Sequence, residues 1–369
     1  MKESIFDKLN EDILEGIEGK NEGIPIGLPK LGKYGNIRKN ILTLIFSTTG
    51  AGKSAMIDTI ILNACDDHIN YPTKLKPDFQ LFSMERASKI RIAKWLCFII
   101  FVKEGVEIQL SKMLGWWEDK LSSYEYNLIL KYKNYVDLLL NDYITIHEGA
   151  KTPNEVFKIM KDHFENKGEY DVKITIDPKT GKERKRKIYI PNNPREIVIP
   201  IFDHGNLVKT TQALPSKKSA IDKLVEMVQE MRDLEGCAPI WVSQVNRAIS
   251  GVTRSKDTEQ ELMMDDVKES GDIVDAADLV ISLFDPLKYK QSSKTGYEPV
   301  DFVDKTNGNN YFRSAQILKS SYGADSVRVP LAFNGFCGQF MELPKRIDLS
   351  EKEYKEMIEE ILTKKFFIN

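Results

Sequence analysis

Residues 41–54, ILTLIFSTTGAGKS, constrain the fold more than any other stretch of the chain. An apolar, β-branched run leads into a glycine-bearing turn that ends in GKS, and a helix-like segment, AMIDTIILNA, follows. A strand, a turn of this kind and a helix in succession are the setting of a phosphate-binding P-loop. Ser47 stands where the usual pattern opens with glycine, so Gly50 and Gly52 must supply the flexible backbone. The alternative is an ordinary glycine-rich turn between a strand and a helix.

In a P-loop, backbone N–H groups of the turn and the N-terminus of the next helix point at the phosphates of a nucleotide. Lys53 would reach the β- and γ-phosphates, and the Ser54 hydroxyl would ligate Mg²⁺. The predicted nucleotide-binding residues are Thr49, Gly50, Ala51, Gly52, Lys53, Ser54 and Ala55.

The charges and cysteines exclude several classes of protein. With 53 Lys and Arg against 55 Asp and Glu, a globally basic nucleic-acid coat is excluded, although a local basic channel is not. The four cysteines form no CxxC pair and are typical of buried thiols in a reducing cytosol. The chain begins without a signal-peptide core, and no apolar run approaches the ~20 residues of a membrane span. We therefore expect a cytoplasmic protein that does not bind membranes.

Apolar runs alternate with amphipathic helical patterns through most of the chain, which predicts an α/β fold. We expect a mainly parallel central sheet with helices on both faces, and antiparallel pairing of the last strands. The predicted strands are 41–46, 78–83, 197–202, 238–243, 278–284, 314–318 and 328–333. The predicted helices include 53–65, 85–102, 154–166 and 218–234.

Three segments lie outside this alternation. Residues 3–18 carry an apolar stripe at helical spacing, which predicts a short helix on a tether that ends at residue 23. Residues 168–195 predict an inserted β-hairpin with a basic returning arm, which is either a solvated surface hairpin or a contact to nucleic acid or a partner protein. Residues 346–369 predict a separate C-terminal helix, which leaves 24–345 as the core domain.

Polar side chains follow three of the predicted strands, where open α/β sheets bind their ligands. Asp203 ends the run IVIPIFD and would hold Mg²⁺ through water. Glu85 follows FSM and would polarise the attacking water, and Gln244 follows IWVS and would contact the γ-phosphate. Strand ends often carry polar caps, so the pattern counts because the three recur together with the P-loop.

Taken in order, the motifs of the chain resemble the RecA-like motor domain of DnaB-type replicative helicases. GIPIGLPKLGKY resembles the opening segment of that domain, STTGAGKSA its Walker A motif, and LFSMERA its F-S-L-E-M motif. IPIFDHGNLV resembles its Walker B segment, and WVSQVNR resembles S-Q-L-N-R. DVKESGDIVDAADLVISL is similar to its L-R-E-S-G-x-I-E-x-D-A-D segment. The last two together are far more specific than a P-loop alone.

The resemblance implies an ATPase that uses ATP and Mg²⁺, forms a hexameric homo-oligomer around single-stranded DNA, and acts as a helicase in DNA replication, with a primase or loader as a further partner. Glu85 would be the catalytic glutamate, with Lys53, Gln244 and Lys319 also in the active site. Helix 3–18 would match the linker helix that packs on the adjacent subunit. Loops facing the channel would contact DNA phosphates through basic residues that are otherwise ordinary exposed charges: Lys209, Lys217, Lys218, Arg247, Arg254 and Lys256.

Four departures from the family pattern stand out. In ILKSSYG, Lys319 and Gly323 fit the family's K-x-R-x-G motif, but Ser321 stands at its arginine, which in this family reaches the neighbour's ATP site. Three alternatives follow: either Lys319 alone suffices for catalysis in the neighbour's site, or Arg313 or Arg328 substitutes for the missing arginine, or hydrolysis is slow. The others are the extra hairpin, Ser47, and the lack of the N-terminal helical domain that these helicases commonly carry, features of a divergent, phage-type version.

Two other functions stay open. A RecA-like DNA-dependent ATPase acting as a recombination mediator or loader would fit the missing arginine, whereas SQVNR followed by KESG favours the helicase. A nucleotide-binding scaffold with weak hydrolysis, assembled with a partner through the hairpin, is the third. Fork unwinding would separate the first two, and single-turnover hydrolysis with and without DNA would separate the third.

Overall fold

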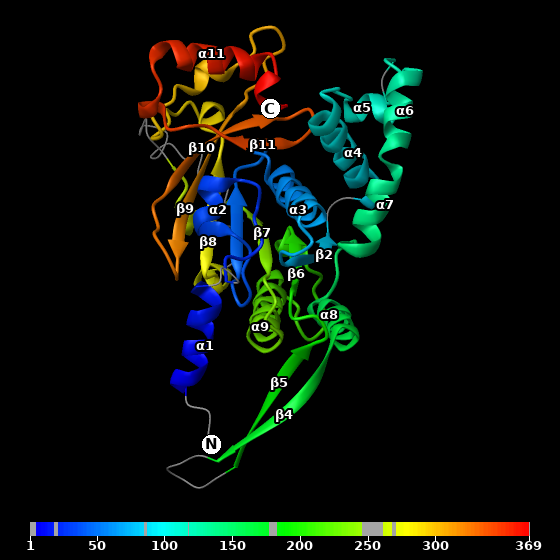
Figure 1. Ribbon diagram of the computed structural model, residues 1–369, viewed down its shortest axis with the longest axis vertical. Coiled ribbons are helices and arrows are strands. Elements are labelled where there is room, and N and C mark those ends of the chain that lie inside the picture. The colour runs from blue at the N-terminus through cyan, green and yellow to red at the C-terminus, as the bar shows by residue number, and fades with distance from the viewer. Residues whose placement is uncertain are drawn as a thin grey trace.

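A nine-stranded sheet forms the centre of the computed structural model, which describes residues 5–17, 21–84, 87–116, 118–176, 183–245, 261–267 and 271–368. The strand order is β11-β10-β9-β8-β1-β7-β6-β2-β3 (Figure 1). The strands of this sheet are β1 (Thr43–Ser47), β2 (Lys76–Ser83), β3 (Ile144–Glu148), β6 (Glu196–Asp203), β7 (Ile240–Gln244), β8 (Leu279–Phe284), β9 (Phe312–Ser320), β10 (Arg328–Asn334) and β11 (Gln339–Glu342).

The six strands from β8 to β3 run parallel, and the remaining pairs from β8 to β11 are antiparallel. This confirms the predicted α/β fold with a mainly parallel sheet and antiparallel last strands. The parallel register brings the carboxyl ends of four strands to the same end of the sheet, where Ser47 pairs with Gln244 and Ser83 pairs with Asp203. The predicted site residues that follow these strands therefore lie together at the carboxyl ends of the parallel strands.

Helices cover both faces of the sheet, as predicted. The α-helices are α1 (Ile5–Ile17), α2 (Pro29–Gly35), α3 (Lys53–Asn70), α4 (Ser88–Glu104), α5 (Leu110–Met113), α6 (Ser123–Lys131), α7 (Lys133–Asp142), α8 (Pro153–Lys167), α9 (Lys217–Glu235), α10 (Gly271–Ala276) and α11 (Glu351–Leu362). Alternate residues of the strands point to opposite faces. One core therefore joins Ile45 and Ile201 to α3, α4 and α7, and another joins Phe46 and Trp241 to α8 and α9. Within the described residues, no helix is both long and apolar enough to cross a bilayer.

Two strands, β3 and β11, were missing from the prediction. β3 lies at one edge of the sheet and buries fully only its first residue, so its sequence ITIHE lacks the apolar run of a central strand. β11 has four residues and lies at the other edge, paired with β10. Short, half-exposed edge strands carry little periodic signal, which explains why sequence reasoning missed both.

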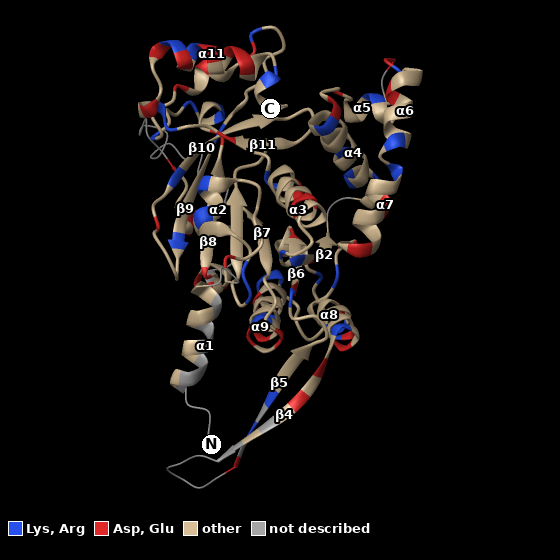
Figure 2. Ribbon diagram, viewed as in Figure 1, with Lys and Arg blue, Asp and Glu red and all other residues tan. Residues whose placement is uncertain are grey.

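The predicted hairpin consists of β4 (Gly168–Ile176) and β5 (Glu183–Pro191), paired in antiparallel register. Its base is fixed by Tyr170, whose hydroxyl donates to Glu235 at 2.8 Å, and by Tyr189, whose hydroxyl donates to the Phe164 carbonyl at 3.1 Å. Beyond this base the hairpin extends away from the sheet (Figures 1 and 2), with Asp171 on β4 and Lys185 and Lys187 on β5.

Both predicted terminal helices are present. α1 extends from the same end of the domain as the hairpin (Figure 1), and its apolar stripe is exposed, with Phe6 at 70% and Ile17 at 76%. α11 begins with the predicted capping box, in which the Ser350 hydroxyl accepts from the Glu353 backbone N–H. Tyr354 of α11 is buried against Tyr297 of the core domain. Thus α11 packs on the core, whereas α1 leaves its apolar side uncovered.

Candidate nucleotide-binding site

The turn between β1 and α3 has the backbone conformation of a phosphate-binding loop. Gly50 and Gly52 adopt left-handed φ angles of +85° and +104°, which glycine adopts far more readily than residues with a Cβ atom. Gly52 directly precedes α3, and its carbonyl accepts from the Met56 N–H at 2.8 Å. The N–H groups of the first turn of α3 therefore face the loop, as anion binding requires.

The structure explains why serine replaces the first glycine of the usual pattern. Ser47 is the last residue of β1, is fully buried, and does not have a positive φ. Its hydroxyl donates to the Thr48 carbonyl at 2.8 Å. Because the chain is still extended at this position, a glycine is not needed there, and the departure does not alter the loop.

Two cations support the loop, one from β9 and one from the turn after β8. The buried Arg313 of β9 donates from Nε to the Ala51 carbonyl at 3.1 Å and pairs with Asp285 at 3.3 Å. Lys288, in the short η4 turn (Leu287–Tyr289) after β8, donates to the Thr49 carbonyl at 2.6 Å. Burial lowers the pKa of Arg313, and the nearby Asp285 opposes that shift. These contacts hold the loop in place from outside the P-loop sequence.

Lys53 and Ser54, the residues predicted to contact phosphate and Mg²⁺, open α3. Lys53 is buried and Ser54 is partly buried. Asp203, at the end of β6, is also buried and presents one carboxylate oxygen, Oδ1, that has no hydrogen-bond partner among the described residues. A buried carboxylate oxygen without a donor is suited to a metal-bound water.

These residues fit Mg²⁺, which is usually held by one or two carboxylates, waters and the phosphates of the substrate. Ser54 and Asp203 would hold the ion, and it would neutralise charge on the phosphates. Among the described residues, no group of three or more His, Cys, Asp or Glu could bind a metal by themselves. A nucleotide would therefore have to supply part of the coordination.

The other predicted residues at this edge are only partly described. Gln244 ends β7 directly beside Ser47, so it lies next to the start of the P-loop. Glu85 lies outside the described residues. The neighbouring Ser83 pairs with Asp203 on one side and with Glu148 on the other, so Glu85 follows a strand whose end is at the site.

Lys319 is not near the P-loop of its own chain. It pairs with Val280 near the start of β8, which places it at the amino ends of the parallel strands. Its Nζ donates to the carbonyls of Val274 and Asp275 at 3.1 and 3.0 Å. Arg313 is committed to its own P-loop, and Arg328 is bound to Glu261 at 2.7 Å. Both alternatives to the missing arginine are therefore bound to groups of their own chain.

The predicted DNA-contacting residues are also partly described. Arg247, Arg254 and Lys256 lie outside the described residues. The Lys217 ammonium donates to the Val208 carbonyl at 2.5 Å, and Lys218 pairs with Asp222 at 2.8 Å. Lys209 is exposed, and its backbone N–H donates to the Lys151 carbonyl at 2.8 Å. Lys217 and Lys218 would have to exchange these partners for phosphates.

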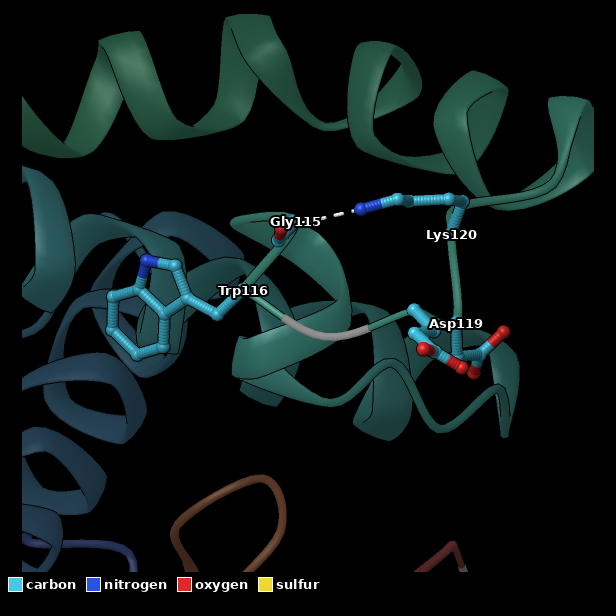
Figure 3. Close-up of a pocket in the computed structure, with 5 residues that line it drawn as sticks. Gly115, Trp116, Asp119 and Lys120 are labelled. Carbon is cyan, nitrogen blue, oxygen red and sulfur yellow. Dashed lines mark hydrogen bonds between the residues drawn. The ribbon is translucent and has the colours of Figure 1, made fainter.

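A broad hollow in the surface lies away from these residues, in the loop between α5 and α6 (Figure 3). Lys120 donates to the Gly115 carbonyl at 3.3 Å, and the side chain of Trp116 points away from Asp119 and Lys120. The polar groups do not converge on one point, so the hollow lacks the arrangement of a binding site.

Sequence reasoning missed two charged residues that contact the site. Arg91 of α4 is buried, and its Nη1 donates to Asp203 Oδ2 at 2.6 Å while its Nε donates to Asp58 Oδ1 at 2.7 Å. Burial raises the pKa of Asp58 although Arg91 opposes the shift. The available signal was an arginine between the apolar residues Ile90 and Ile92 of a helix rich in apolar residues, since a charge that such a helix buries needs a buried partner.

No protein-family model matches the chain, and no curated protein matches it either. Solved structures do match. The chain is similar to one described as an ATPase domain, with a TM-score of 0.67 and 19% identity over 93% of this chain and 100% of that one. It is also similar to "The Structure Of A DnaB-Like Replicative Helicase And Its Interactions With Primase", with a TM-score of 0.66 and 19% identity over 93% of this chain and 69% of that one. The protein therefore has the RecA-like fold of the ATPase domain of DnaB-like replicative helicases.

Proposed function

We propose that the protein is an ATP-dependent DNA helicase or translocase of DnaB type, which hydrolyses ATP with Mg²⁺ to move along single-stranded DNA during replication. The observation that carries the proposal is the grouping of the predicted site residues at the carboxyl ends of the parallel strands. It brings together the P-loop at Ser47, Gln244 and the unpaired oxygen of Asp203. The fold supports the proposal, because the two solved structures match it with TM-scores of 0.67 and 0.66 over 93% of this chain.

Within this proposal each residue has a distinct task. Lys53 and the P-loop amides bind the phosphates, Ser54 and Asp203 hold Mg²⁺, and Glu85 positions the attacking water. Gln244 contacts the γ-phosphate, and the loss of that phosphate after hydrolysis would change this contact and thereby affect the residues that follow β7. Lys319 lies at the amino ends of the parallel strands, whereas its own P-loop lies at their carboxyl ends. It would therefore act in the site of a neighbouring subunit.

The exposed α1 favours an assembly of several copies, which we propose is a hexameric ring. A 13-residue helix is marginally stable alone, so an apolar stripe as exposed as that of Phe6 and Ile17 needs a surface to pack on. The neighbouring subunit would supply that surface, and the DNA would pass through the centre of the ring.

The test is the steady-state ATPase rate against protein concentration, with and without single-stranded DNA. A rate per subunit that rises cooperatively with concentration and is stimulated by DNA is expected, because each site is completed by a neighbour. A low rate that ignores both variables would contradict the proposal.

One observation favours a second function. Ser321 stands at the family's arginine, and of the two alternatives Arg313 is bound to its own P-loop and Arg328 to Glu261. An arginine finger is worth about 10³–10⁵ in rate. A DNA-dependent ATPase that acts as a loader or recombination mediator tolerates slow hydrolysis better than a helicase does. Unwinding of a forked duplex at a rate matched to ATP turnover would exclude this second function.

A further inference from the structure

The guanidinium of Arg91 joins three elements that each carry part of the candidate site. It donates to Asp203 of β6 and to Asp58 of α3, the helix that begins with Lys53. Arg91 belongs to α4, the helix that begins shortly after Glu85. Asp58 is fixed in turn by Trp95, whose indole N–H donates to the same oxygen at 2.9 Å. One side chain therefore connects the P-loop helix, the metal-binding strand and the helix after the predicted catalytic glutamate.

The hydrogen bonds divide the two oxygens of Asp203 between two tasks. Oδ2 accepts from Arg91, whereas Oδ1 is buried and has no partner among the described residues. Arg91 Nη2 is likewise buried without a partner there, so the polar cluster is incomplete as it stands. A metal-bound water at Oδ1 would donate to this otherwise unsatisfied acceptor.

Stability alone gives a weak reason for this cluster. Buried ion pairs often contribute little, because the cost of removing charges from water offsets their attraction. Apolar side chains of similar volume would fill the same space between α3, α4 and β6. What an apolar residue cannot do is fix the rotation of the Asp203 carboxylate. A planar guanidinium with two of its nitrogens bound to two carboxylates does so.

We propose that Arg91, anchored by Asp58, is a positioning residue that holds Asp203 with Oδ1 directed at the Mg²⁺ shell. The inference rests on the proposed function, because it assumes a nucleotide with a divalent cation at this site. It adds a residue outside the P-loop and strand-end motifs. It also links α4 to Asp203, the residue that would hold the metal.

The test uses Arg91→Lys, which keeps the charge but loses the planar, two-directional hydrogen bonding. The matched control is Arg232→Lys. Arg232 of α9 pairs with Asp278 at 2.9 Å at the amino ends of the parallel strands, away from the candidate site. The affinity of Mn²⁺, used in place of Mg²⁺, is measured by electron paramagnetic resonance on the full chain with ADP bound. The affinity for ADP in excess EDTA and the melting temperature are measured in parallel.

Arg91→Lys is expected to weaken Mn²⁺ binding about tenfold, the equivalent of one charge-assisted hydrogen bond, and to leave metal-free ADP binding unchanged. Arg232→Lys is expected to leave Mn²⁺ binding unchanged even where it lowers the melting temperature. Asp58→Asn keeps Arg91 but weakens its second anchor, and should reduce Mn²⁺ affinity by less than Arg91→Lys does. Asp58→Asn decides the matter should Arg91→Lys fail to fold.

Two outcomes overturn the inference, and they differ. If wild-type protein hydrolyses ATP and binds Mn²⁺ with ADP, but both the Arg91 and Asp58 variants bind Mn²⁺ normally, the cluster is structural and the proposed function stands. If the wild-type protein binds no Mn²⁺ with ADP, the proposed function falls and the inference falls with it.

Discussion

Replacing Gly52 by alanine should damage both the fold and the nucleotide site. At its φ of +104°, a residue with a Cβ atom costs about 1–2 kcal/mol in backbone strain. The new Cβ would lie 2.8 Å from Phe340 Cζ and 3.1 Å from Phe333 Cζ. These rings are stacked with centroids 4.3 Å apart, so neither can move freely, and such overpacking costs about 1–3 kcal/mol.

The two contributions together predict a loss of about 2–5 kcal/mol. For a chain of 369 residues, an unfolding entropy of about 2.1 cal/mol/K per residue converts 1 kcal/mol into about 1.3 °C. Differential scanning calorimetry should therefore show a melting temperature lower by roughly 3–6 °C for Gly52→Ala. ATP binding, measured by isothermal titration, should fall in the same variant because the loop amides leave their positions.

Gly335→Ala is the matched control, because its Cβ would meet Phe333 at an ordinary 3.6 Å and its φ is not positive. It should change stability by less than about 0.5 kcal/mol. Adding Phe340→Leu to Gly52→Ala should recover the packing part of the loss but not the backbone part, a coupling of about 1–2 kcal/mol. A Gly52→Ala protein that melts with the wild type and binds ATP normally would refute the reasoning.

Three other variants test the predicted roles directly. Lys53→Ala should abolish ATP binding by removing the cation that contacts the β- and γ-phosphates, and normal binding by equilibrium dialysis would end the P-loop interpretation. Glu85→Ala should leave ATP binding intact and remove turnover, because it acts on the water and not on the phosphates; unchanged single-turnover hydrolysis would place the base elsewhere. Charge reversal across residues 184–187 should weaken single-stranded DNA binding and flatten its dependence on salt by about 0.7 in log–log slope per lost phosphate contact. An unchanged slope would leave the hairpin to solvent or to a protein partner.

The sequence predicted the central strands and their helices because apolar runs and amphipathic helices differ clearly in period. The edge that carries Asp203 and Gln244 followed from the same reasoning, since parallel strands end together. The hairpin and the α11 capping box were also confirmed.

What sequence reasoning missed depends on tertiary contacts. Arg313 lies in β9 and Ala51 in the P-loop, 262 residues apart, so no local pattern predicts their hydrogen bond. Arg91 and Asp58 are ordinary residues for amphipathic helices until burial forces them to pair. The position of Lys319 at the opposite edge from the P-loop follows from the antiparallel direction of β9, which a list of motifs does not contain.

β9 has a mechanical consequence. Arg313, near its first residue, holds the P-loop of its own subunit, and Lys319, near its last, lies at the far edge of the sheet. The six residue steps between them span about 20 Å. β10 pairs with β9 from Phe312 to Gln316, and β8 pairs with it along the other side, with an irregularity in register beside Lys319. In a ring where Lys319 enters the next site, β9 would connect the P-loop that Arg313 holds to the nucleotide of the neighbouring subunit, so that a shift of the P-loop moves the same chain's Lys319 in that site.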